Sequence, residues 1–247
     1  MNLLELEKRL ELHGKVVKCT MAAPFGTETE VYYMNNKKRN RKKLLSLIAA
    51  AAVLAGLTTA FAAGGLGGWH SYHADRIDSI TDSAPVAEKL GFEPVLIESF
   101  ENGYSYADGS VMDNTVTEDD GSVREEFKSA FFIYEKEGDE VWFSQDRSDS
   151  INVEKGELAA KVDGIDLYYY SYNNKVVPED YERTAGDIAA EESGELIISW
   201  GSDTVRQFVV QAVEWRSGGI AYILMQTDGA LTADELIAMA KEVIAAS

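Results

Sequence analysis

Two histidines lie close together in the sequence, and their spacing is the first feature that could bind a metal ion. His70 and His73 are three positions apart, so they would share one face of a helix, and Asp75 follows with a further ligand atom. This spacing is unspecific in a polar linker. We therefore expect solvated linker histidines and no metal site.

Carboxylates cluster in two stretches of the chain. The run from Asp113 to Asp120 closes on Glu118-Asp119-Asp120-Gly121, and a second run is Asp146-Arg147-Ser148-Asp149-Ser150. Carboxylate oxygens suit Ca²⁺, but neither run has the ligand spacing of an EF-hand loop. Charged hairpin tips often carry such runs. We predict solvated loops and no cofactor.

The most concentrated aromatic stretch is Tyr168-Tyr169-Tyr170-Ser171-Tyr172. Because alternate side chains of a strand point to opposite faces, one face would hold Ile165, Leu167 and Tyr169. The opposite face would hold Tyr168, Tyr170 and Tyr172. If only the first face covers a core, these three tyrosines form a binding surface. The alternative is that both faces are covered and that the tyrosines favour strand pairing.

No set of residues suited to nucleophilic or acid–base catalysis is recognisable. Ser171, Ser199 and Ser202 are isolated hydroxyls without a nucleophile elbow, and His13 is the only further histidine. The single cysteine, Cys19, excludes an intrachain disulfide and any multi-cysteine metal centre. We expect a protein that is not an enzyme.

An apolar segment divides the chain into two parts of opposite charge. Leu44 to Ala63 is a run of twenty residues without a charge, long enough to cross the roughly 30 Å hydrocarbon core of a bilayer as a helix. Residues 1–43 hold ten Lys/Arg and five Asp/Glu, whereas residues 64–247 hold 13 and 37. Six of the seven residues 37–43 are basic, so the positive-inside rule places the N-terminus in the cytoplasm.

These features predict four regions: a cytoplasmic segment (1–43), a single transmembrane helix (44–63), a stalk (64–81) and an extracytoplasmic domain (82–247). The predicted location is the cell membrane, with the apolar run acting as a signal anchor. In the alternative, residues 44–57 are the core of a signal peptide cleaved near Ala60-Phe61-Ala62, with translation starting at Met34. The domain is exported in both cases.

The outer region alternates strand-like runs with glycine turns, which predicts an antiparallel sheet. The turns are Asp108-Gly109, Asp120-Gly121, Gly138-Asp139, Asp163-Gly164 and Gly218-Gly219. The expected strands are Val95–Phe100, Val111–Thr117, Phe127–Tyr134, Val141–Gln145, Leu158–Val162, Ile165–Tyr172, Glu195–Trp200, Val205–Trp215 and Ile220–Gln226.

Helices are predicted at both ends of this region, which gives an α+β fold with helices on one face of the sheet. A short helix begins near Asp82 or Ser83, has Pro85 in its first turn and stops at Gly91. An amphipathic helix begins at the capping box of Thr232 and Glu235. Its apolar residues recur at helical spacing: Leu236, Met239, Ala240, Val243 and Ile244.

The charge distribution also predicts partners. A domain this acidic repels nucleic acid and anionic lipid headgroups, so cations or basic proteins are better partners outside. In the N-terminal segment Leu3, Leu6 and Leu10 share one face of a possible helix, which predicts a docking surface for a cytoplasmic protein. We therefore expect a membrane protein with protein partners on one or both sides.

The end of the chain resembles a group of Gram-positive membrane proteins and lipoproteins whose outer domain has unknown function. The resemblance covers Ala212-Val213-Glu214-Trp215, Gly218-Gly219-Ile220-Ala221-Tyr222 and the helix from Leu231 to Ala240. The group is similar in layout to anti-sigma-type regulators, and the resemblance implies architecture and topology but no catalytic residues. Residues 1–43 lack the zinc-binding or longer helical module of such regulators.

Together these features predict a non-catalytic, membrane-anchored sensing or interaction protein. The alternative is a carrier or ligand-binding domain whose curved sheet and C-terminal helix enclose an apolar molecule.

Overall fold

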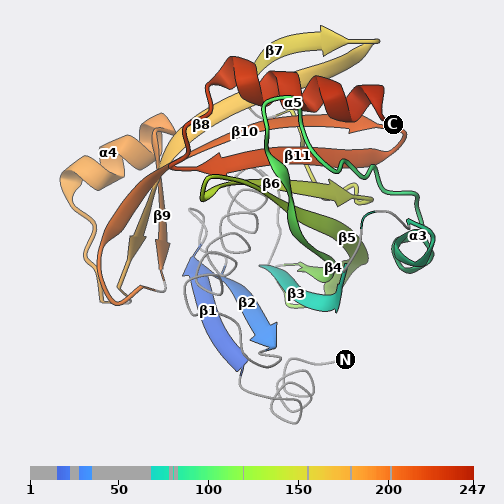
Figure 1. Ribbon diagram of the computed structural model, residues 1–247. Coiled ribbons are helices and arrows are strands. Elements are labelled where there is room, and N and C mark those ends of the chain that lie inside the picture. Colours follow the sequence, from blue (N-terminus) through green and yellow to red (C-terminus); the bar gives the residue numbers. More distant parts are fainter. Residues whose placement is uncertain are drawn as a thin grey trace.

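The chain folds as an α+β protein, as the sequence predicts (Figure 1). The structure is a computed structural model that describes residues 16–22, 28–34, 68–77, 80, 83–118, 120–154, 156–178, 180–200 and 202–247. Within these ranges an 11-stranded, mostly antiparallel sheet is accompanied by three helices.

The sheet has the order β1-β2-β3-β4-β5-β6-β11-β10-β8-β7, and β9 pairs with β8 beside β7. The strands are β1 (Val16–Ala22), β2 (Glu28–Met34), β3 (Gly68–Arg76), β4 (Ser105–Thr117), β5 (Val123–Lys136), β6 (Asp139–Asp146), β7 (Glu157–Val162), β8 (Ile165–Val177), β9 (Leu196–Trp200), β10 (Arg206–Ser217) and β11 (Ile220–Thr227).

Hairpins join β4 to β5, β5 to β6, β7 to β8 and β10 to β11, and four of the five predicted glycine turns lie in them. The exceptions to antiparallel pairing are β2 with β3 and β8 with β9. Parallel strands need a crossover connection, and α4 (Ala185–Ser193) lies in the one between β8 and β9. The expectation that successive strands are always antiparallel neighbours was therefore wrong here, because helix α4 was not recognised.

Two strand predictions also need correction. The stalk expected over residues 64–81 includes β3, which pairs with β4 from Gly68 to Arg76. Strand β3 was not recognised because its sequence is polar. A strand in a well-covered sheet can nevertheless carry hydroxyl and charged residues. The predicted strand Val95–Phe100 makes only one isolated bridge, from Ser99 to Ser105. The side chain of Gln145 binds the backbone of Val95 in place of a neighbouring strand.

The predicted turn at Asp108-Gly109 lies inside β4. The register against β5 shifts between Tyr106 and Asp108, so the pair lies directly after a bulge. A Cβ at Gly109 would stand 2.9 Å from both the Phe132 ring and the Tyr106 hydroxyl. The glycine is needed for close packing at this point.

Both predicted helices are present with the predicted ends. Helix α3 (Ala84–Leu90) has proline in its first turn and ends at Gly91 with φ +75°, a left-handed conformation that glycine adopts without strain. Helix α5 (Ala233–Ala245) begins at the capping box, where Thr232 N donates to Glu235 Oε2 at 2.8 Å. Its five predicted apolar residues are all buried.

Helices α3 and α5 cover the first face of the sheet (Figure 1). Phe143 and Tyr222 of the sheet pack there with Leu236 and Met239 of α5. Buried Gln145 of β6 holds segment 92–97 over this face, since its amide donates to Val95 O at 2.7 Å and accepts from Val95 N at 2.8 Å. Both groups that the backbone of Val95 would offer to a strand are thereby used.

The second face of the sheet carries a separate apolar cluster. Trp142, Phe131 and Ile223 belong to it, and Ile151 and Val153 of the loop after β6 pack against it. No residue of α3, α4 or α5 is a member of this cluster. The sheet is thus apolar on both faces.

Several predictions fall on parts of the chain that the structure does not describe. These are the transmembrane helix (44–63), the docking leucines Leu3, Leu6 and Leu10, and most of the cytoplasmic segment. Among the described residues, no helix is both long and apolar enough to cross a bilayer.

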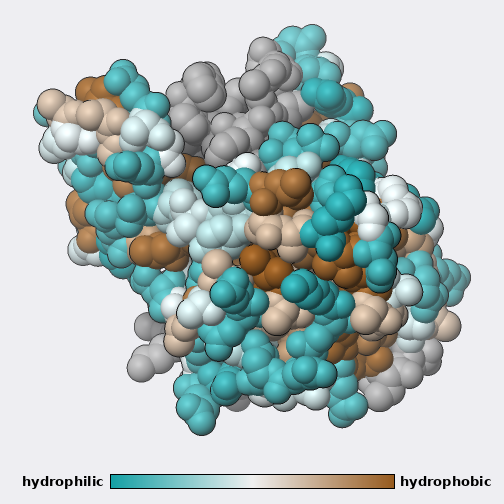
Figure 2. All heavy atoms as spheres, turned by 90° about the horizontal axis from the view of Figure 1, so that it is seen from above, coloured by the Kyte–Doolittle hydropathy of each residue, from teal (hydrophilic) through white to brown (hydrophobic). Residues whose placement is uncertain are grey.

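Seen from the side of α5 and β7, the molecular surface is largely hydrophilic, with apolar areas between the polar ones (Figure 2). The exposed large apolar side chains of the described residues are scattered over β7, α4, β10 and neighbouring segments: Val123, Leu158, Ile188, Val205 and Val209.

Candidate functional site

The strongest candidate site lies on the second face of the sheet, where β6 places a carboxylate. Alternation along β6 directs Val141, Phe143 and Gln145 to the first face. The opposite positions, Trp142, Ser144 and Asp146, therefore point to the second face. Asp146 is only 4% exposed although it ends its strand.

A line of hydrogen-bonded side chains crosses four neighbouring strands to reach this carboxylate. Ser71 of β3 donates to Asn114 Oδ1 of β4 at 2.6 Å, and Asn114 Nδ2 donates to Ser129 Oγ of β5 at 2.7 Å. The hydroxyls of Ser129 and Ser144 each donate to one carboxylate oxygen of Asp146. We call these five buried residues the polar row.

The surroundings of Asp146 raise its pKa from 3.8 to about 6. Burial is the largest cause, because it disfavours the charged carboxylate. The two serine donors and the positive charge of Arg216 act in the opposite direction. Arg216 is itself fixed by the loop after β6, since its Nη2 donates to Ser148 O at 3.1 Å and to Ile151 O at 2.7 Å.

A second buried carboxylate, Glu214, lies on β10 on the same face of the sheet. It is fully buried and accepts a hydrogen bond from the Tyr170 hydroxyl at 2.8 Å. Burial and this negative charge raise the pKa of both Tyr170 and Tyr172 well above 10. The two rings stack with their centroids 6.2 Å apart.

The tyrosine stretch has the predicted alternation but not the exposed surface. Leu167 joins the first cluster, whereas Tyr170 and Tyr172 join the second. Tyr170 and Tyr172 are 8% and 7% exposed, and Tyr168 is half-buried. The surface of Tyr168, Tyr170 and Tyr172 is therefore corrected to the alternative interpretation, in which both faces of the strand are covered.

The metal-binding patterns are separated in the structure. His70 and His73 lie in strand β3, and Asp75 pairs with Lys89 at 3.0 Å. Asp113 lies in β4 and pairs with Lys128. No group of three potential ligand residues with metal-site geometry occurs in the described ranges.

Asp146 was assigned to a solvated loop, and this prediction was wrong. The signal that identifies it is the strand alternation of Val141-Trp142-Phe143-Ser144-Gln145-Asp146, which places Asp146 on the same face as Trp142 and Ser144. The predicted strand ended at Gln145, one residue short of its observed end, because Asp146 was assigned to the charged run that follows.

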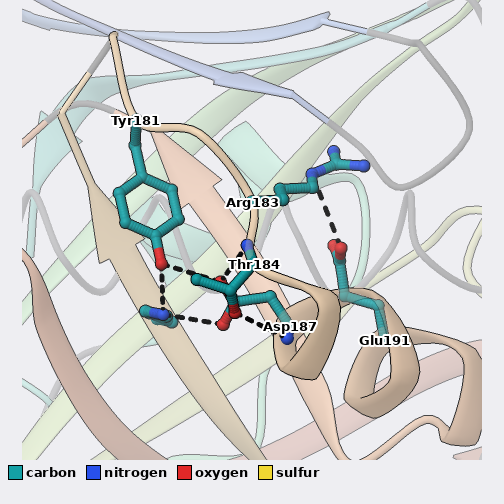
Figure 3. A network of polar contacts seen from close by, with 6 residues as sticks. Tyr181, Arg183, Thr184, Asp187 and Glu191 are labelled. Atoms are coloured by element: carbon teal, nitrogen blue, oxygen red, sulfur yellow. Dashed lines mark hydrogen bonds and ion pairs between the residues drawn. The ribbon is translucent and has the colours of Figure 1, made fainter.

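A second polar network, around α4, has a structural role. Asp187 accepts hydrogen bonds from Lys175 Nζ at 2.7 Å, Tyr181 Oη at 2.7 Å and Thr184 N at 2.9 Å, while Arg183 pairs with Glu191 at 3.5 Å (Figure 3). Lys175 holds the pKa of the Asp187 carboxyl well below its usual range, together with the Thr184 and Tyr181 donors. The Lys175 contact joins the start of α4 to β8, and the others join α4 to the segment that precedes it.

The isolated serines are likewise structural. Ser199 Oγ donates to Asn174 Oδ1 at 3.1 Å, and Ser202 accepts from the Arg206 guanidinium. Ser171 is exposed.

The polar row can do one kind of chemistry by itself. A buried carboxylate whose pKa is raised to about 6 exchanges a proton in mildly acidic solution, and two hydroxyls adjust to either protonation state. No family model matches the chain, and no similar protein was found among curated sequences or solved structures.

Proposed function

We propose that the chain is a membrane-anchored sensing or interaction protein without catalytic activity, whose α+β domain binds its partner outside the cytoplasm. The observation that carries this proposal is the division of charge around residues 44–63. The net charge is +5 before this uncharged run and −24 after it. Close to the run, six of the seven residues 37–43 are basic, whereas Arg76 is the one Lys or Arg in 64–78, and this Lys/Arg bias agrees with insertion that retains the basic side in the cytoplasm.

The partner outside is a basic protein or another envelope ligand with a complementary surface. The domain's negative field attracts positively charged surfaces and repels nucleic acid and anionic headgroups. On the cytoplasmic side, the face formed by Leu3, Leu6 and Leu10 would bind a second protein. An anti-sigma-like layout, with one protein contact on each side of the membrane, agrees with the resemblance of the C-terminal region.

One observation favours a second candidate function, a carrier or binding domain for an apolar molecule. The sheet is apolar on both faces, and α3, α4 and α5 leave the second cluster to strands and a loop. A sheet face of this composition suits an apolar ligand.

The pairing of β2 with β3 opposes the predicted topology. Val31 of β2 is the partner of Ser71 in β3, so these strands belong to one sheet. A single crossing at residues 44–63 would place them on opposite sides of the membrane. The pairing and the crossing exclude each other, and topology is therefore the measurement that tests the proposal.

A reporter that is active only outside the cytoplasm, fused after Ser247, should be active, and the full-length product should remain with the membranes. Asp substitutions at Leu6 and Leu10 should then remove a co-purifying cytoplasmic protein without changing insertion. Soluble activity in the medium with a new N-terminus near Ala63 would refute the anchor and retain export. An inactive reporter would refute both and would favour the β2–β3 pairing.

A further inference from the structure

The polar row connects Asp146 to the strand that follows the apolar segment. Its far end is Ser71 in β3, which begins at Gly68, five positions after Ala63. Asn114 and Ser129 link Ser71 to Asp146 through direct hydrogen bonds between side chains. The carboxylate is thus coupled to the strand nearest the predicted membrane.

Protonation of Asp146 must rearrange these hydrogen bonds. The ionised carboxylate only accepts, and it accepts from Ser129 and from Ser144. The neutral acid carries a proton that one of these hydroxyls has to accept, so that hydroxyl must turn its own proton elsewhere. Ser129 Oγ is also the acceptor for Asn114 Nδ2, which passes the change toward β3.

The other charged groups on this face are few among the described residues. From β10, Arg216 interacts with Asp146, and Glu214 lies on the same face. From β5, Glu125 accepts hydrogen bonds from Ser148 and Ser150 of the loop after β6. The facing residues of β11 and β4 are uncharged: Ala221, Ile223, Met112 and Asn114.

We propose that Asp146 and the polar row form a proton-responsive element that makes the pairing of β3 with the rest of the sheet depend on external pH. The proposal rests on the sensing function proposed above and names its stimulus, the proton. At pH values above the titration of Asp146, the sheet holds a buried negative charge on this face. At lower pH the Asp146 carboxyl is protonated, and the polar row then contains no charge.

The sign follows from the pKa of Asp146, which is about 6 in the folded protein and 3.8 for an unperturbed group. Between these values the folded state binds the proton more tightly than the unfolded state does, so stability is highest in acid. It falls as the pH rises through about 6 and then levels off. A difference of about 2 pKa units corresponds to about a hundredfold change in the unfolding equilibrium constant.

Hydrogen exchange of the full-length chain in detergent micelles tests the proposal. Protection of amides 68–77, corrected for intrinsic exchange, should fall by up to about a hundredfold between pH 4 and pH 7 in the wild type. In Asp146→Asn it should not change across this range. Asp149→Asn, an exposed carboxylate three positions away, is the matched control and should behave as the wild type does.

Ser71→Ala tests the route of coupling. It leaves Asp146 and its two donors in place, so the global unfolding midpoint should keep its pH dependence while protection of β3 no longer follows it. Persistent pH dependence in Asp146→Asn would overturn the role of the carboxylate. A β3 response that survives in Ser71→Ala would overturn the role of the polar row.

Ser144→Ala covers the case in which Asp146→Asn does not fold. Loss of one donor to the ionised carboxylate should move the transition to higher pH, and an unchanged midpoint would refute the proposal. These measurements use the purified chain, so their outcome is independent of the reporter that tests topology.

Discussion

At the scale of single residues, a close backbone approach occurs at a glycine directly before β7. Gly156 has φ +76°, and a Cβ there would lie 2.2 Å from the carbonyl oxygen of Tyr169. Glu157 pairs with Tyr169 directly afterwards, so this glycine sets the register of β7 on β8. Backbone atoms cannot move aside as the end of a long side chain can.

We expect Gly156→Ala to lower the free energy of unfolding by about 3 kcal/mol, because the clash displaces an edge strand. Gly164→Ala is the matched control, since Gly164 has φ +87° but nothing within 4 Å of the added Cβ. It should cost only the backbone strain, about 1 kcal/mol. Chemical denaturation of both variants measures the difference, and equal losses would contradict the close approach.

At the scale of elements, α4 is short and depends on its N-terminal network. Its capping box of Thr184 and Asp187 is supplemented by Lys175 of β8, and the pair of Lys175 and Asp187 is largely buried. The helix buries few residues of its own. Polar contacts, more than apolar burial, hold this crossover on the sheet.

Asp187→Ala should therefore lower the free energy of unfolding by about 2–4 kcal/mol, because it removes a cap and leaves Lys175 without its carboxylate. The pKa of Asp187 is lowered in the folded protein, so this stabilisation is present above about pH 4. It is lost as the pH falls toward the folded pKa.

Melting curves of the wild type and Asp187→Ala should accordingly differ most near neutral pH and converge in strong acid. Glu192→Gln, an exposed change on the same helix, is the control and should stay within about 0.5 kcal/mol. A constant difference at every pH would exclude the ion pair as its cause.

At the scale of the whole molecule, β3 lies between β2 and β4 in the described sheet. It pairs with β4 along its length, and Ser71 anchors it through the polar row. Without β3, the long edge of β4 would expose unpaired backbone groups, which favours association between molecules. The sheet also contains no disulfide, since the chain has one cysteine.

We expect a fragment of residues 68–247 to fold as a soluble monomer without metal, and a fragment starting at residue 77 to be less stable and to associate. Light scattering and thermal unfolding compare the two fragments. Adding a chelator should leave the melting temperature of the longer fragment unchanged. A drop of many degrees would restore the calcium interpretation of the acidic runs.

The sequence by itself determined the local elements of this protein. The capping box of Thr232 and Glu235, the stop at Gly91 and most glycine turns act within a few residues, so their chemistry can be recognised without the fold. The alternation of the tyrosine stretch is local in the same way. The strand-like runs, glycine turns and helix caps together indicated the α+β class, and charge and the apolar run indicated the proposed division of the chain.

Only the tertiary structure decided what covers each face and which distant residues meet. Tyr170 meets Glu214, 44 positions away, and Asp146 accepts a hydrogen bond from Ser129 of the neighbouring strand β5. Gln145 replaces strand pairing for Val95 across 50 positions. These contacts depend on strand order and register, which local propensity does not specify, and for that reason the polar row was not recognisable in the sequence.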